Sequence, residues 1–171
     1  MYYKTTCPSP VGEITLACDG TNLVGLWLAG QKYYGGSIAD AMTGNDDFPI
    51  FDAAKKWLER YFNGEKPDIS ELPLAPIGGE FRQAVWKFLC EIPYGEVTTY
   101  GEIAAKMAAK MNRKSMSAQA VGGAVGHNPI SIIIPCHRVV GANGGLTGYA
   151  GGLATKARLL ELEGAETSAR R

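Results

Sequence analysis

The stretch that decides the fold is residues 130–140, which have the sequence ISIIIPCHRVV. An apolar run of this length is typical of a buried strand, and Pro135 would end its hydrogen-bonding ladder. We therefore predict a strand that delivers Cys136 to its end, where a site can open. A thiol reacts as its thiolate, and a neighbouring imidazole or guanidinium favours that form. His137 and Arg138 bring both groups within two residues of the sulfur.

The same pair also has a structural interpretation. A free cysteine is among the most buried residue types, and the histidine beside it can be a structural group. For an isolated Cys-His pair this interpretation is the favoured one. The rest of the sequence must therefore decide between a reactive thiol and a structural one.

The composition is that of a globular protein with one compact domain or two small ones. The 171 residues are 46% hydrophobic and 20% charged, which is ordinary for such proteins and ample for a core. The N-terminus, residues 1–5, shows no apolar signal region, and no apolar run approaches the roughly 20 residues that span a bilayer. We therefore expect a cytoplasmic protein with no membrane partner.

The cysteine and histidine content argues against metal chemistry. The four cysteines are scattered without CxxC spacing, at Cys7, Cys18, Cys90 and Cys136. They match neither a zinc cluster nor a disulfide framework. Only His127 and His137 could add imidazole ligands, so we expect no metal and no cofactor.

Charge is distributed unevenly although the net charge is zero. Residues 1–78 carry 6 basic and 10 acidic side chains (net −4), and residues 79–171 carry 11 basic and 7 acidic (net +4). Four basic residues follow one another without an intervening acid, at Lys106, Lys110, Arg113 and Lys114. A polyanion would bind the second half, although a solvated basic face would have the same composition.

The first part of the chain predicts a small α+β domain over residues 1–76. Strands are expected at 2–6, 11–18 and 23–28, separated by turn residues, and a polar loop follows to residue 49. Apolar residues then recur at helical spacing over 51–62. Residues 65–76 are rich in proline and acids without periodicity, which predicts a linker.

The second part, residues 77–171, is predicted to be mainly helical. Helical periodicity begins at Gly79 and stops at Pro93, and a second helix is expected at 100–108 with threonine caps before it. A basic loop leads to a helix of small residues at 115–125. Two helices joined in this way fit a helix-turn-helix, in which the small side chains allow close approach to DNA or simply to another helix.

Two further elements complete this part. Residues 141–152 form a glycine-rich loop without the lysine of a phosphate-binding P-loop, which could let a flat ligand lie against the backbone. A last helix is expected at 153–164, with Leu159, Leu160 and Leu162 facing inward and Glu163 near its end.

These motifs resemble the O6-alkylguanine-DNA alkyltransferases (methylated-DNA–protein-cysteine methyltransferases). The segment PCHRVV at 135–140 follows Asn128-Pro129 and precedes GYAGGL at 148–153. Further matches are FRQAVW at 81–86, IPYGEVTTY at 92–100 and AVGGA at 120–124. The resemblance covers nearly all of residues 79–164 in order. The first 76 residues are similar to the family's ribonuclease-H-like domain more loosely, by size and by order of elements.

The resemblance implies a single-turnover repair protein acting on double-stranded DNA that carries alkylated guanine, as a monomer. The second helix of the helix-turn-helix would lie in the minor groove, and the damaged base would be flipped into a pocket. A soft thiolate would displace the alkyl group from O6 of guanine, or from O4 of thymine, and keep it as a thioether.

The resemblance also implies roles for individual residues. Cys136 would be the acceptor, His137 would deprotonate it through a water, and Glu163 would orient His137. Asn128 would hold the turn that frames the site, and Tyr100 would act at the flipped nucleotide. The guanine would be lined by Val139, Tyr149 and Ala150. The duplex would be contacted by Gln119, Ala120, Gly123 and Lys114. Arg138 follows the motif, and a role in tying down the turn competes with a catalytic one.

Two positions depart from the family pattern. The family commonly has an arginine that enters the duplex where the base leaves, and Gln119 stands at the matching position. Glutamine can fill the gap and hydrogen-bond the orphan cytosine, but it adds no charge. Ala150 stands where some members have serine, so only its backbone amide could meet the guanine oxygen.

Rival functions remain open at the level of the sequence. A Cys-His-Glu hydrolase or transferase with true turnover would use the glycine-rich loop for an oxyanion hole. A non-catalytic lesion-binding protein of the alkyltransferase-like kind would lack the acceptor cysteine, which is present here. A metal-binding regulator lacks ligands. Stoichiometry distinguishes the first rival, because a turnover enzyme makes more than one product per protein.

Overall fold

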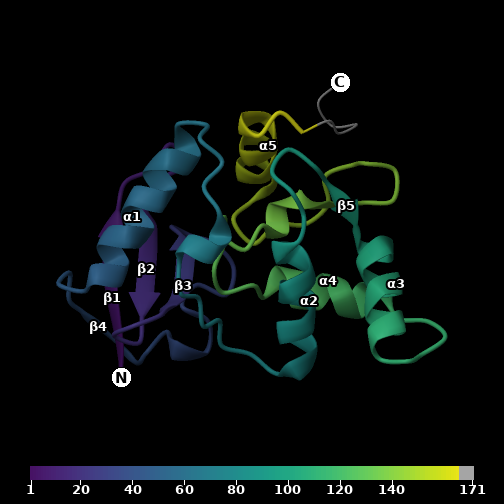
Figure 1. The fold of residues 1–171 in the computed structure, drawn as a ribbon, viewed down its shortest axis with the longest axis horizontal. Helices are drawn as coiled ribbons and strands as arrows, with labels where there is room; N and C mark the ends of the chain where they lie inside the picture. Colours follow the sequence, from purple (N-terminus) through teal and green to yellow (C-terminus); the bar gives the residue numbers. More distant parts are fainter. Residues whose placement is uncertain (166–171) are drawn as a thin grey trace. The chain divides into compact units, whose positions relative to one another are not determined.

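The computed structural model describes residues 1–165, which fall into two units (Figure 1). The first unit is Met1–Ile77 with Pro129–Ile133, and the second is Gly78–Asn128 with the chain from Ile134 onward. The α+β class is as predicted, with a sheet and a long helix in the first unit and mainly helices in the second. Sequence placed one boundary at residues 76/77, whereas the structure also assigns residues 129–133 to the first unit. Over residues 1–165 we find no helix that is both long and apolar enough to cross a membrane.

The first unit is built on a four-stranded sheet in the order β3-β2-β1-β4. Its strands are β1 (Tyr2–Cys7), β2 (Ile14–Cys18), β3 (Leu23–Leu28) and β4 (Met42–Gly44). β2 is antiparallel to β1 and β3, and β4 is parallel to β1. The three predicted strands are confirmed, the second starting later than expected. β4 and the 3-10 helix η1 (Gly36–Ile38) interrupt the expected polar loop, and neither is long enough to leave a periodic pattern.

Helix α1 (Pro49–Phe62) packs on β2 and β3 and confirms the predicted helix. Pro49 begins it, where a missing N–H costs nothing, and Gly64 follows its C-cap with a φ of 83°. Its inward side chains are apolar: Ile50, Phe51, Ala54, Trp57, Leu58 and Tyr61. All six are buried, so α1 covers the sheet with a continuous apolar face.

The expected linker at 65–76 is wrong in part, because its end pairs with the edge of the sheet. Leu23 N donates to Pro73 O and Ala75 N donates to Leu23 O, both at 2.8 Å. The 3-10 helix η2 (Ile69–Glu71) lies before this segment, with a capping box from Asp68. A segment rich in prolines and acids therefore supplies hydrogen-bond partners to the backbone of Leu23 at the start of β3.

The second unit contains four helices within the described chain: α2 (Glu80–Cys90), α3 (Tyr100–Lys110), α4 (Ala118–Gly126) and α5 (Leu153–Leu162). α2, α3 and α4 contact one another, with α3 and α4 forming the predicted helix pair. The Thr99 and Ser117 side chains cap α3 and α4 by accepting from Glu102 N and Ala120 N. In α5, Leu159 and Leu160 are buried as predicted, but Leu162 is 38% exposed, which corrects its inward placement.

The decisive stretch at 130–140 is buried as expected, but it is not a strand. Before Pro135, only Ile130 makes a ladder contact, an isolated bridge to Leu26, and a turn follows. Ile132 has a φ of 71°, and Ile133 N donates to Ser131 O across it at 2.8 Å, which makes a γ-turn. A branched residue in this conformation is strained by about 1–3 kcal/mol. Burial without a ladder therefore explains why the apolar run misled the strand prediction.

Candidate active site around Cys136

Cys136 begins a short 3-10 helix, η3 (Cys136–Arg138), directly after Pro135. Pro135 has φ −82° and ψ 65°, and Cys136 N donates to Ile134 O across it at 2.8 Å. Directly after η3 the chain becomes β6 (Val139–Val140), which pairs in parallel with β5 (Thr98–Thr99). A tight turn and a two-strand ladder therefore hold the thiol between fixed backbone segments.

The Asn128 side chain holds this turn. Its Nδ2 donates to Ile134 O at 2.8 Å, and its side chain also hydrogen-bonds the Cys136 thiol. Asn128 follows the C-cap of α4, so the end of that helix and the thiol share one anchoring residue. This geometry supports the framing role expected for Asn128.

Burial dominates the titration of the thiol. Cys136 is 6% exposed, and this burial raises its pKa, which hydrogen bonding from Asn128 and the charge of Lys156 only partly offset. The resting group is therefore the neutral thiol, although the sequence suggested that neighbouring cations would favour the thiolate. The cation that acts on the sulfur is Lys156, twenty residues away in sequence, and not Arg138, which is only two residues away. A thiol of this kind needs a base at the moment of reaction.

His137 and Glu163 form a buried pair. His137 Nε2 lies 2.7 Å from Glu163 Oε2, and both side chains are fully inaccessible to solvent. Glu163 is the C-cap of α5, where Gly95 N adds a hydrogen bond to Oε1 at 3.3 Å. Burial would raise the pKa of the Glu163 carboxyl, but His137 and Arg138 outweigh it and lower that pKa to about 2. The carboxylate is therefore ionised and accepts from His137.

An ionised acceptor at Nε2 defines the state of the imidazole. Nε2 carries the proton, and Nδ1 presents its lone pair. Nδ1 is buried and has no hydrogen-bond partner within the described part of the chain. Burial lowers the pKa of His137 against the opposing effect of Glu163, so the neutral form persists near neutral pH. The result is an unused buried acceptor on the residue next to the thiol, which is what a general base requires.

Lys156 is a site residue that sequence reasoning missed. It is fully buried on α5, and its Nζ donates to the carbonyl oxygens of Val139, Thr147 and Gly148 at 2.6, 2.9 and 3.1 Å. Burial lowers the pKa of its ammonium to about 8. The available signal was its position, three residues before Leu159 and seven before Glu163, on the inward face of the last helix.

The other expected substrate residues lie on the segments that Lys156 ties together. Tyr100 begins α3, and its hydroxyl donates to Thr147 O at 3.1 Å. Burial raises the pKa of the Tyr100 phenol, and the charge of Cys136 adds to this, which brings phenol and thiol into one neighbourhood. Val139 accepts from Lys156 through its carbonyl, while Tyr149 and Ala150 are half-buried in the turn before α5.

The expected DNA-contacting residues lie on the surface of the helix pair. Gln119, Ala120 and Gly123 are exposed on α4, and Lys114 is exposed in the loop before it. A Cβ placed on Gly123 would meet nothing within 4 Å. The exposed face of α4 is therefore flat enough for a backbone to approach closely, while Val121, Ala124 and Val125 are buried on its other side.

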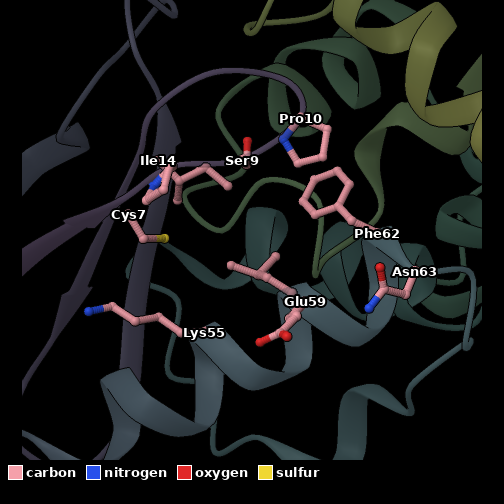
Figure 2. Close-up of a pocket in the computed structure, with 10 residues that line it drawn as sticks. Cys7, Ser9, Pro10, Ile14, Lys55, Glu59, Phe62 and Asn63 are labelled. Carbon is pink, nitrogen blue, oxygen red and sulfur yellow. The ribbon is translucent and has the colours of Figure 1, made fainter.

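A separate pocket of about 350 Å³ lies in the first unit (Figure 2). It opens between the segment after β1 and helix α1, and its polar groups include the Cys7 thiol, the Lys55 ammonium and the Glu59 carboxylate. Burial raises the pKa of Cys7, partly offset by Lys55. Neither histidine lines this pocket, so it lacks the thiol–imidazole pairing found at Cys136.

Comparison with known proteins identifies the family. Residues 1–76 match the ribonuclease-like domain of 6-O-methylguanine DNA methyltransferase, and residues 80–165 match its DNA binding domain. Among named relatives, the methylated-DNA–protein-cysteine methyltransferase of Haemophilus influenzae is 45% identical over 94% of this chain and 86% of its own length. That of Methanosarcina acetivorans is 47% identical over 96% of this chain and 99% of its own length.

Solved structures agree. The crystal structure of Mycobacterium tuberculosis OGT in complex with DNA superposes with a TM-score of 0.79 at 44% identity, over 95% of this chain and 92% of that one. Both domains of this chain, in order and nearly end to end, are thus similar to one kind of protein. The chain belongs to the family of the methylated-DNA–protein-cysteine methyltransferases.

Proposed function

We propose that this protein repairs double-stranded DNA by transferring the alkyl group of O6-alkylguanine irreversibly to Cys136. It acts once per molecule, as a monomer in the cytoplasm. Family membership supports alkyl transfer from DNA to a protein cysteine. The observation that supports Cys136 as the acceptor is its buried thiol beside His137, whose Nδ1 is an unused buried acceptor.

The first step is proton removal from Cys136. His137 Nδ1 accepts this proton through a bridging water, and the charge that develops on the imidazole is stabilised by Glu163 at 2.7 Å. Lys156 stabilises the thiolate as it forms, because its charge lowers the pKa of the thiol. In this mechanism the Cys136 thiolate and the His137 imidazolium form only when substrate is present. The buried thiol therefore stays neutral at rest.

The second step is displacement at the alkyl carbon. The sulfur forms a bond to that carbon, the carbon–O6 bond breaks, and its electron pair passes into the guanine ring system. The Tyr100 hydroxyl supplies a hydrogen bond to the base as this charge develops. The guanine anion then takes up a proton from water and His137 releases the proton that it accepted, so that neutral guanine is restored. The thioether that remains has no easy route to hydrolysis, so the reaction stops after one transfer.

The base must first leave the duplex. Flipping costs a few kcal/mol, and least for a damaged pair. The exposed face of α4 approaches the minor groove, Gln119 occupies the space left by the base, and Lys114 contacts phosphate. The flipped guanine then lies against Val139 and the Tyr149-Ala150 turn, where only a backbone amide is available at Ala150.

Intact-mass measurement after incubation with a duplex containing O6-methylguanine tests this function. We expect one added methyl, about 14 Da by formula, mapped by peptide analysis to the thiol of Cys136. A duplex with O4-methylthymine tests the second lesion in parallel. Cys136→Ala should abolish transfer and retain DNA binding, whereas Cys90→Ala, a matched thiol on α2, should retain both.

Two results would reject the proposal. More than one product per protein would show turnover and favour the hydrolase-type rival. Methyl gain at another cysteine, or its persistence in Cys136→Ala, would show that the acceptor has been assigned wrongly.

A further inference from the structure

Arg138 is held in place from several sides. Its Nε donates to Glu163 Oε1 at 2.8 Å and its Nη2 to Glu163 Oε2 at 3.1 Å. Its Nη1 donates to Ile92 O at 2.6 Å, and the guanidinium lies 5.8 Å from the centre of the Tyr94 ring. The residue is only 6% exposed. A planar fork that fits both oxygens of a buried carboxylate fixes the orientation of that carboxylate.

One carboxylate therefore accepts from two charged or titratable side chains. Glu163 accepts from Arg138 on both oxygens and from His137 on Oε2. A buried carboxylate with His137 as its sole partner would draw a second proton onto the imidazole, giving an imidazolium–carboxylate pair. With the guanidinium present, the carboxylate is already balanced by the positive charge of Arg138.

The surroundings of His137 favour its neutral form. Burial has the largest effect and lowers the pKa of the imidazole, and Arg138 and Lys156 lower it further. Glu163 opposes them by raising it. Cys136 adds no charge at rest because burial raises the pKa of its thiol. Of the two cations, Arg138 is the one bonded to the carboxylate that His137 uses.

We propose that Arg138 is a positioning residue that keeps the His137 base unprotonated and in its Nε2–H tautomer by occupying both oxygens of Glu163. It touches neither substrate nor sulfur and acts through Glu163. This inference rests on the proposed function in that His137 is taken as the base, but it concerns a protonation state that can be measured without DNA.

The two histidines of the chain provide the experiment. His127 Nδ1 lies 2.8 Å from the Gly123 carbonyl oxygen, which can only accept, so Nδ1 carries the proton there. His137 carries its proton on Nε2. Imidazole ¹⁵N NMR of the intact protein should therefore resolve two opposite tautomers, with His127 as an internal reference.

The variant Arg138→Gln should raise the pH at which His137 is protonated by roughly one unit or more, because the cation hydrogen-bonded to its partner Glu163 is lost. The acid limb of the single-turnover rate with O6-methylguanine DNA should move upward with it. Arg82→Gln, at an exposed position on α2, is the matched control and should shift neither. Should Arg138→Gln fail to fold, Arg138→Lys keeps the charge, cannot bridge both oxygens, and should give a smaller shift in the same direction.

Three outcomes would overturn the inference. Titration of His137 at the same pH in Arg138→Gln and in wild type, together with a lower rate, would make Arg138 purely structural. Protonation of wild-type His137 at neutral pH, or a proton on its Nδ1, would contradict the inference directly. A normal His137 titration in a protein that fails to transfer methyl would instead reject the proposed function and leave the role of Arg138 standing.

Discussion

The Tyr100 hydroxyl and the Lys156 ammonium donate to the same acceptor, the carbonyl oxygen of Thr147, at 3.1 and 2.9 Å. The Lys156 ammonium also lies 6.0 Å from the centre of the Tyr100 ring. The start of α3, the glycine-rich loop and α5 are thus joined at one oxygen. In the proposed mechanism Tyr100 hydrogen-bonds the bound base instead, and Lys156 would then still donate to that carbonyl and hold the loop in place.

Lys156→Met should impair Cys136 without removing any group that touches the alkyl carbon. The variant keeps the chain length but loses the charge that lowers the pKa of the thiol. We expect the pH for half-maximal alkylation of Cys136 by iodoacetamide, followed by peptide mapping, to rise by roughly one unit. Methyl transfer at neutral pH should fall about tenfold, since one pKa unit is a factor of ten in thiolate. Lys87→Met, at an exposed site on α2, should match wild type in both measurements.

Ionisation of Glu163 should make the free energy of unfolding depend on pH in the acid range. Its folded pKa of about 2 lies below the ordinary 4.5, so its contribution is present above pH 4.5 and is lost as pH falls through 2. A shift of this size corresponds to about 3 kcal/mol. Urea unfolding of wild type should show this loss across that window.

Glu163→Gln should reduce the dependence of the free energy of unfolding on pH over the same range. The variant should be less stable by about 3–5 kcal/mol near neutral pH, because Arg138 is left buried without its carboxylate. The two curves should converge as pH falls. Glu161→Gln, exposed on the same helix, should retain the wild-type acid dependence. Parallel curves for Glu163→Gln and wild type would show that the carboxylate is not the titrating group.

Local rules explain which parts of the fold could be predicted. The threonine cap predicted before residue 100 is confirmed at Thr99. The helix expected at 115–125 begins instead at Ala118, after a cap on Ser117. Leu159 and Leu160 face inward on the same side of their helix as Lys156 and Glu163. Leu162 is off this face, at the last position of the helix, and is therefore exposed. These outcomes depend on neighbours within a few residues, which a sequence displays.

Tertiary effects explain what could not be predicted. The run around Ile132 is apolar because it is buried, yet its backbone turns, and periodicity does not distinguish these two cases. The cation that acts on Cys136 comes from α5, and Arg138, two residues from the thiol in sequence, binds Glu163 instead. The sequence motif therefore identified the residues of the site, but it pointed to Arg138 and not to Lys156 as the cation that acts on Cys136.

Gln119→Ala should separate duplex opening from chemistry. The side chain is exposed on α4 and makes no contribution to the Cys136 site in the proposed mechanism. Single-turnover repair of duplex O6-methylguanine should slow by roughly tenfold or more, since flipping costs a few kcal/mol that the wedge offsets. Transfer from a free O6-alkylguanine base should keep its wild-type rate. Equal slowing on both substrates would reject the wedge role.

Gly123→Ala should stabilise the fold and weaken DNA binding. Its added Cβ would meet nothing within 4 Å, and glycine inside a helix costs about 1 kcal/mol relative to alanine. Gly123→Ala should therefore raise the free energy of unfolding by up to that amount. If the exposed face of α4 lies against the DNA backbone, the same methyl group should weaken duplex binding in a gel-shift titration, and Gly123→Leu should weaken it further. Ala53→Leu, exposed on α1, should leave binding unchanged. Wild-type affinity in Gly123→Leu would place the DNA on another surface, because a leucine cannot be accommodated in a close helix–backbone contact.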